Sequence, residues 1–570
     1  MKDERTFSYP LLIIILALLS FGRTMALHDV AWDDNCWLLS SYFTNNLDGF
    51  LDTGFYELRR VPMGVLYYYY YLLHTLTDHA HLIWNSFNMV VQVLSPLLLY
   101  AFIKNTLKGQ KLLSFLIAAG FIICPIDMTL PYYANINYRL GTFFCILSFY
   151  LTERALAGKT SWALLLASMA SSAFPLYFLL ETALTLEPAR LLLIGYVLSG
   201  KCPDRRTLIK KTLDLWIPFV LLCVPLIIYR LISKPYGIYS STYTMNPYFF
   251  MNIKMHIKVL RHFLFYNWAI YLSLIQNTGL WSVIAGLITT IITLIYSDRF
   301  VTSGIEDIRT SKNAFKDSWL LNWKSVRPVF IFGLMLIIPP VMMYEFSGRI
   351  PAPGMEGRHG TILLFGYSIV FGSLLYCLYR TLLSKWKVRA KALIILVLSL
   401  GVFFNNVNLD LYKMGENYQK GFWKAFTARF PSLPDKATFL IDANANSPFY
   451  NADLEAYYEL EFPLNMLYAR SKSHDEFLNY RVYAISEGIR DEWKQSSSMT
   501  FQRYSHAGKD TFVTDRMIFI HYRDGELLVN REILDKFPDV PYNMWLDKDL
   551  PGPSGKIPEY PLRYKLKGFY

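Results

Sequence analysis

Long apolar runs separated by short polar segments dominate residues 8–405. A membrane-spanning helix needs about 20 mostly apolar residues. By this measure the pattern predicts eleven spans, at residues 8–27, 82–103, 112–130, 138–152, 160–173, 176–199, 213–232, 279–297, 328–345, 360–380 and 392–405. The stretch from His256 to Leu274 carries Lys258, Arg261 and His262, which favours an amphipathic helix on the membrane surface.

The pattern changes at about residue 406, where the chain becomes polar and charged and prolines recur. Thr438–Asp442 has the composition of a strand, and residues 453–470 that of a helix. Residues 511–521 and 526–529 flank Arg523-Asp524-Gly525, which is typical of a β-hairpin. The sequence therefore predicts a polytopic α-helical membrane module at 1–405 and a soluble α+β domain at 406–570.

Composition agrees with this division, since 53% of the residues are apolar and only 18% are charged. Basic residues concentrate in the loops near 104–111, 201–211, 298–327 and 380–391, whereas residues 27–62 hold six acids and two arginines. Basic loops stay in the cytoplasm, so we expect a cytoplasmic N-terminus and an exported 406–570 domain. The net charge of +12 then reflects membrane topology and does not indicate nucleic-acid binding.

The first span lacks a clear cleavage pattern, which favours an uncleaved anchor over a signal peptide. The six cysteines lie mostly in or near spans and show no metal-binding spacing, so we expect neither a disulfide scaffold nor a zinc site. No Asn-x-Ser/Thr acceptor occurs. In an exported region of this size, that absence favours a bacterial inner membrane.

Two adjacent carboxylates, Asp33 and Asp34, follow the first span in the predicted external loop 28–81. A carboxylate can act as the base that activates an acceptor hydroxyl, and arginines can stabilise a departing lipid phosphate. Arg59 and Arg60 lie in the same loop. The alternative interpretation is that the acids are solvated loop residues and that the arginines flank a helix at the head-group level.

Three short motifs resemble the GT-C superfamily of membrane glycosyltransferases, which use polyprenyl-phosphate sugars and carry an acidic motif in the first external loop. The motifs are Trp32-Asp33-Asp34, then Arg60-Val61-Pro62-Met63, then Trp84-Asn85-Ser86-Phe87-Asn88-Met89. Further segments resemble the branch of transmembrane O-mannosyltransferases that carry tetratricopeptide repeats. These segments are Cys124-Pro125-Ile126-Asp127, Asn135-Ile136-Asn137-Tyr138-Arg139 and Phe178-Leu179-Leu180-Glu181-Thr182.

The resemblance covers about residues 8–200 and implies an inverting sugar transfer with Asp33 or Asp34 as base. Asp33 is favoured, because in many members the first acid of the pair is the base. The repeats of that branch are absent, and Asp127 stands where the branch has a longer spacing to a glutamate, so sugar and acceptor identity do not carry over. We expect no cofactor, with the lipid-linked sugar as donor substrate; no metal-ligating residues are predicted, and dependence on a divalent metal stays open.

Several charged residues near span ends are further candidates. Asp127 and Arg139 bracket a short external loop. Either Asp127 lines the substrate cavity and Arg139 binds the donor phosphate, or the two residues form a structural ion pair. Glu181 lies in an apolar stretch, so it either has a partner or lines a wet cavity.

The predicted external loop between the ninth and tenth spans carries further bases. Arg349, Arg358 and His359 are positioned either to hold the lipid phosphate or to anchor a helix end. Tyr67 and Tyr68 begin a run of five tyrosines that favours interfacial anchoring, with stacking on a sugar as the alternative.

Together these features predict a membrane glycosyltransferase that moves a sugar from a polyprenyl phosphate to a surface glycan, glycolipid or protein. The alternative is a lipid-linked-sugar flippase or a polymerase-like membrane protein. A transporter would show inverted repeats with broken helices, and no such symmetry is visible in the sequence.

Overall fold

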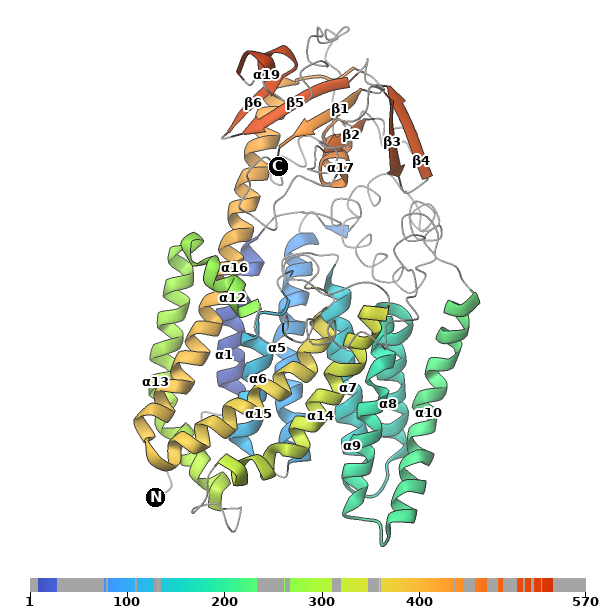
Figure 1. Ribbon diagram of the computed structural model, residues 1–570, viewed down its shortest axis with the longest axis vertical. Coiled ribbons are helices and arrows are strands. Elements are labelled where there is room, and N and C mark those ends of the chain that lie inside the picture. The colour runs from blue at the N-terminus through green and yellow to red at the C-terminus, as the bar shows by residue number, and fades with distance from the viewer. Residues whose placement is uncertain are drawn as a thin grey trace.

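The computed structural model describes residues 9–27, 76–77, 80–107, 110–127, 129, 135–232, 261, 267–309, 319–346, 358, 360–434, 437–443, 457–468, 480–484, 500–505, 508–513, 517–523 and 525–536. These residues form a helical bundle that carries β-strands beyond one of its ends (Figure 1). We call that end of the bundle the sheet-facing end and the other the opposite end.

Ten helical segments of the described chain are long and apolar enough to cross a membrane. Backbone groups in lipid must be satisfied within the segment, so these apolar runs fold as helices. The chain is therefore a polytopic helical membrane protein, as the sequence predicts. The helices concerned are α1 (Tyr9–Phe21), α5 (Ala80–Thr106), α7 (Ile136–Ala157), α8 (Trp162–Phe174), α9 (Glu187–Ser199), α10 (Arg205–Ile232), α13 (Leu280–Arg309), α14 (Trp319–Phe346), α15 (Thr361–Lys385) and α16 (Lys387–Arg429). α1, α8 and α9 reach spanning length together with an adjoining 3-10 or π-helical turn, in the segments Tyr9–Ala26, Trp162–Leu179 and Glu181–Ser199.

The third predicted span, 112–130, differs from the prediction. Its helix, α6 (Lys111–Ile123), has 13 residues and is about 20 Å long, shorter than the roughly 30 Å hydrocarbon layer. Every residue from Leu112 to Ile123 is buried, with α5 and α15 among its neighbours. The side chains of α6 are apolar because other helices surround them. An apolar composition alone does not show whether a helix contacts protein or lipid.

The predicted surface helix at 256–274 is described mainly from residue 267, where α12 (Asn267–Ser273) begins. Trp268 stacks on Phe371 with 6.1 Å between ring centroids, and its indole N–H donates to Tyr367 Oη at 3.3 Å. This short helix is therefore fixed against α15. The short 3-10 helix η8 (Ile275–Asn277) follows it and leads into α13.

The predicted division at residue 405 falls inside α16, which continues unbroken for 43 residues. The first half of α16 packs with α13 in the bundle, and its last turns pack on the sheet, where Phe426 and Phe430 contact Phe439. One rigid helix thus connects the bundle to the strands, and at about 1.5 Å per residue it is about 65 Å long.

The main sheet has the strand order β2-β1-β5-β6. Its members are β1 (Thr438–Asp442), β2 (Arg481–Ala484), β5 (Met517–Arg523) and β6 (Glu526–Val529). β1 is parallel to β2 and β5, whereas β5 and β6 form the antiparallel hairpin that the sequence predicts. β3 (Thr500–Ser505) and β4 (Gly508–Val513) form a separate hairpin, and α17 (Tyr457–Leu467) and α19 (Arg531–Lys536) complete the described elements.

The helices alternate in direction, so the loops divide between the two ends of the bundle. α1 begins at the opposite end, and α16 leaves the bundle at the sheet-facing end (Figure 1). The basic loops near 104–111, 201–211 and 380–391 connect helices at the opposite end, whereas α7 and α15 begin at the sheet-facing end. These basic loops therefore lie at the end of the bundle opposite the strands, as an odd number of crossings between the N-terminus and the strands requires.

Candidate functional site

The exit of the first span is held from two sides by what we call the exit clamp: Arg23, Leu27, Asn85 and Asp410. Helix α1 passes into a short 3-10 helix, η1 (Gly22–Ala26). Arg23 Nη1 lies 2.8 Å from Asp410 Oδ1 on α16. Asn85 Nδ2 on α5 donates to the Leu27 carbonyl at 3.1 Å. The chain therefore leaves the bundle from a fixed point.

Asp410 also holds the start of α13. Its Oδ2 accepts the Gly279 backbone N–H at 2.7 Å, and the Ser282 hydroxyl donates to the same oxygen. A carboxylate at a helix N-terminus is favoured by the helix dipole. A Cβ at position 279 would lie 2.7 Å from the Asp410 carboxylate, so this approach requires glycine. Asp410 thus joins the beginning of α13 to η1.

A second cluster, the Arg139 cluster, consists of Asn88, Asp127, Thr129 and Arg139. Arg139 donates through Nε to Asp127 Oδ2 at 2.7 Å and through Nη2 to Oδ1 at 3.4 Å. Arg139 Nη1 lies 3.4 Å from Asn88 Oδ1. The backbone N–H and the hydroxyl of Thr129 donate to Asp127 Oδ1 at 3.0 and 2.8 Å. The ion pair that the sequence allowed is therefore present.

The Arg139 cluster exists because α6 is short. Pro125 lies just past the end of α6 and the chain turns there, which brings Asp127 beside Arg139 in the first turn of α7. The side chains of Arg139 and Asp127 are 2% and 8% exposed. With so little surface, Arg139 is suited to positioning α5, α6 and α7 rather than to contacting a ligand directly.

Asn85 and Asn88 connect the exit clamp to the Arg139 cluster. They lie three residues apart on α5, on neighbouring positions of one face. Both are buried, as is Trp84 beside them. The Trp84–Met89 motif thus holds the end of the first span and the start of α7 at a fixed separation.

Glu181 lies at a turn rather than inside a span. The chain passes from α8 through a π-helical turn, η3 (Pro175–Leu179), and an extended Leu180 into η4 (Glu181–Leu186). Gly141 of α7 fits closely against this turn, since a Cβ there would lie 3.1 Å from Leu180 Cβ. Glu181 is partly exposed, and the neighbouring Thr182 lies 3.4 Å from Tyr344 Oη on α14.

Arg358 lies just before α15, at the sheet-facing end, and is 8% exposed. The remaining predicted site residues lie outside the described residues: Asp33, Asp34, Arg59, Arg60, Tyr67, Tyr68, Arg349 and His359. Of the predicted set, the structure therefore brings Asp127 and Arg139 into contact and places Glu181 and Arg358 at the same end of the bundle.

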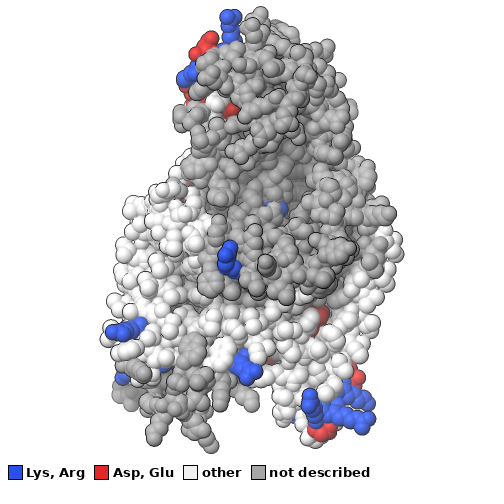
Figure 2. All heavy atoms as spheres, viewed as in Figure 1, with Lys and Arg blue, Asp and Glu red and all other residues white. Residues whose placement is uncertain are grey.

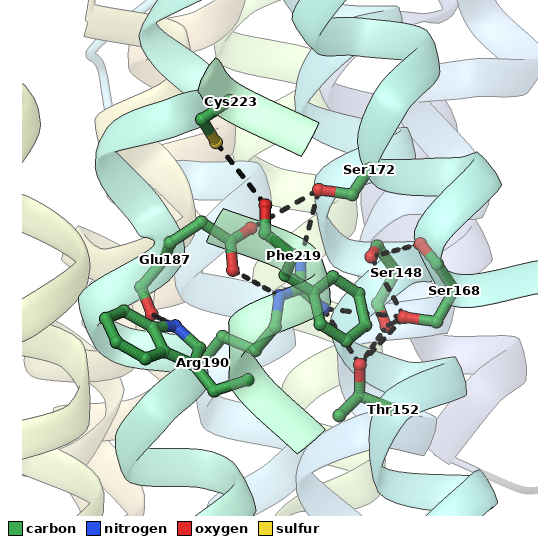
Figure 3. A network of polar contacts seen from close by, with 9 residues as sticks. Ser148, Thr152, Ser168, Ser172, Glu187, Arg190, Phe219 and Cys223 are labelled. Atoms are coloured by element: carbon green, nitrogen blue, oxygen red, sulfur yellow. Dashed lines mark hydrogen bonds and ion pairs between the residues drawn. The ribbon is translucent and has the colours of Figure 1, made fainter. Parts of the chain in front are cut away.

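Asp410 is among the buried ionic groups that the sequence interpretation missed. Another is Arg190, which Figure 3 shows among α7, α8, α9 and α10. Its Nε donates to Glu187 Oε2 at 2.8 Å and its Nη1 to Thr152 Oγ1 at 2.8 Å. The guanidinium lies between the rings of Phe149 and Phe219, 4.4 and 4.2 Å from their centroids.

Ser168 and Ser172 accept the remaining hydrogen bonds that Arg190 donates. Because its charge is paired and its N–H groups are hydrogen-bonded, Arg190 can lie among transmembrane helices, where it links them to one another. The sequence signal was a Glu and an Arg three residues apart in an apolar run, facing Ser and Thr at helical spacing on α7 and α8. Among the described residues no group of three His, Cys, Asp or Glu could hold a metal ion.

No protein-family model matches this chain, and no curated protein is significantly similar to it.

Proposed function

We propose that this protein is a membrane glycosyltransferase of the GT-C type, which moves a sugar from a polyprenyl-phosphate donor to a glycan, glycolipid or protein acceptor. The observation that supports the proposal is the convergence, at the sheet-facing end, of the first-span exit with two of the sequence motifs. The first-span exit, the Trp84–Met89 motif and the Asp127–Arg139 segment are far apart in sequence, yet Asn85 and Asn88 bind the other two.

The exit clamp limits where the acidic pair can act. Leu27 is fixed by Asn85, and Asp33 follows six residues later. Six residues reach at most about 21 Å. Asp33 therefore remains within about 21 Å of the Leu27 anchor, a reach that allows it to act on a substrate at the sheet-facing end.

The proposed reaction is a single displacement. The acceptor hydroxyl oxygen attacks the anomeric carbon, the bond from that carbon to the phosphate oxygen breaks, and the polyprenyl phosphate leaves. The hydroxyl proton passes to the Asp33 carboxylate, with Asp34 as the alternative base. A guanidinium near the leaving phosphate stabilises the charge that develops on it, and Arg358 is the candidate that the structure describes at the sheet-facing end.

In this proposal the protein lies in a bacterial inner membrane with the sheet-facing end outside. The region carried by α16 then stands over the outer end of the bundle, where an acceptor glycan arrives. The Arg139 cluster acts by holding α5, α6 and α7 in register beneath that region.

The test uses the purified full-length protein in lipid nanodiscs with radiolabelled polyprenyl-phosphate sugars and candidate acceptors. Transfer of label and release of polyprenyl phosphate are expected from the wild type. Asp33→Asn keeps the side-chain shape and removes the basic oxygen, so turnover should fall by at least about 100-fold. Asp48→Asn, in the same predicted loop, is the matched control and should retain activity.

The outcomes separate the proposal from its alternatives. Full activity in Asp33→Asn with loss in Asp34→Asn moves the base by one residue. Full activity in both variants contradicts the proposed mechanism. Movement of the lipid-linked sugar between leaflets without release of polyprenyl phosphate would identify a flippase instead.

A further inference from the structure

The start of α10 combines a cluster of bases with an apolar stripe, and neither feature belongs to the site described above. Arg205, Arg206 and Lys210 line a shallow, open hollow on the surface of the helix together with Ile209 and Leu213. The three bases are exposed. Figure 2 shows Lys and Arg gathered at this lower end of the molecule, beside a largely uncharged flank.

The bases of this hollow are available to a ligand. Within the described part of the chain, Arg205, Arg206 and Lys210 take part in no ion pair. The acids nearest in sequence are Asp204 and Asp214. Asp204 is committed elsewhere, because its oxygens accept the Thr207 N–H at 2.9 Å and the Thr207 hydroxyl at 2.6 Å. These hydrogen bonds lower the pKa of Asp204, so it remains an ionised cap of α10.

The apolar stripe continues from the bases along one face of α10. Exposed apolar side chains recur at nearly every fourth residue, which keeps them on one face of the helix. They are Ile209, Leu213, Ile217, Leu221, Val224 and Ile228. Only 22% of the α10 span is buried inside the protein, compared with 83% for α15. This face of α10 is therefore turned towards the bilayer.

We propose that the start of α10 is a binding site for an anionic phospholipid. The lipid phosphate lies in the hollow against Arg205, Arg206 and Lys210, and one acyl chain follows the stripe from Ile209 towards Leu221. The argument rests on charge and shape. Bases at one end of an apolar stripe complement a molecule with a charged head and a long apolar tail, whereas a soluble acidic partner would leave the stripe unused.

A second basic cluster at the same end of the bundle provides a matched control. Lys387, Arg389 and Lys391 open α16 and carry the same charge. There, however, Lys391 pairs with Asp298, and Arg389 stacks on Trp386 with 4.5 Å from its guanidinium carbon to the ring centroid. Because Arg389 and Lys391 already have partners, these two bases should contribute little to lipid binding.

The experiment measures binding of phosphatidylglycerol to the delipidated full-length protein by native mass spectrometry. Each base near the membrane surface contributes about fivefold to the affinity for an anionic lipid. The triple variant Arg205→Gln, Arg206→Gln, Lys210→Gln should therefore bind on the order of 100-fold more weakly. The control Lys387→Gln, Arg389→Gln, Lys391→Gln should lose at most about fivefold in affinity, the contribution of Lys387 alone.

Two further arms test the shape of the site. Leu213→Ser with Ile217→Ser should weaken binding of long-chain phosphatidylglycerol and leave the dihexanoyl lipid unaffected. Phosphatidylcholine with the same tails, and inorganic phosphate alone, should both bind poorly. Equal binding of phosphatidylglycerol and phosphatidylcholine, or equal losses in the two triple variants, would overturn the proposal. Equal thermal stability of all variants in phosphatidylcholine nanodiscs verifies that they are folded.

Discussion

The Arg139–Asp127 pair provides the sharpest test of how the sheet-facing end is held together. Arg139→Met removes the guanidinium and leaves the Asp127 carboxylate buried. Removing one partner of a buried ion pair costs about 3–5 kcal/mol. The side chains are 2% and 8% exposed, so water screens the remaining charge little. Because Thr129 still donates two hydrogen bonds to Asp127, we expect the lower end of that range.

The assay is a double-mutant cycle with Asp127→Asn, in which the free energy of unfolding is measured in mixed micelles by tryptophan fluorescence. The double variant removes both charges, so its loss should be smaller than the sum of the two single losses, with a coupling of about 1–3 kcal/mol. Arg206→Met, at an exposed arginine, should change stability by less than about 0.5 kcal/mol. A similarly small effect of Arg139→Met, or additive losses in the cycle, would refute this reasoning.

Two further predictions concern packing and the proposed donor site. Gly372→Ala would place a Cβ 2.6 Å from Ile117 Cα on α6, a backbone atom that cannot move aside, and should lower the free energy of unfolding by about 1–3 kcal/mol. Gly286→Ala is its control, with 3.4 Å to Phe403 Cβ, and should be neutral or slightly stabilising. Arg358→Lys keeps the charge without the bidentate fork and should reduce transfer partially, whereas Arg358→Ala should nearly abolish it. Unchanged donor binding and turnover in purified, folded Arg358→Ala would remove Arg358 from the site.

The spans could be predicted from the sequence because the requirements of the lipid environment apply to each segment separately. A segment in the hydrocarbon layer must be apolar and must satisfy its own backbone, so ten of the eleven predicted spans coincide with helical segments long enough to cross a membrane. The β5–β6 hairpin could also be predicted, because its turn residues and flanking strands are adjacent in sequence. The parallel pairing of β1 with β2 and β5 was not, because it joins strands separated by long segments.

Tertiary structure alone decided which charged residues meet. Nothing near Arg23 in the sequence indicates that it pairs with Asp410, and nothing near Arg190 indicates that it lies between Phe149 and Phe219, because these partners come from helices distant along the chain. Apolar periodicity likewise could not show that α6 is a short helix enclosed by other helices, since protein and lipid favour the same side chains. Local composition therefore determined the elements of this protein, whereas the packing of α5, α6, α7 and α16 determined the polar contacts at its sheet-facing end.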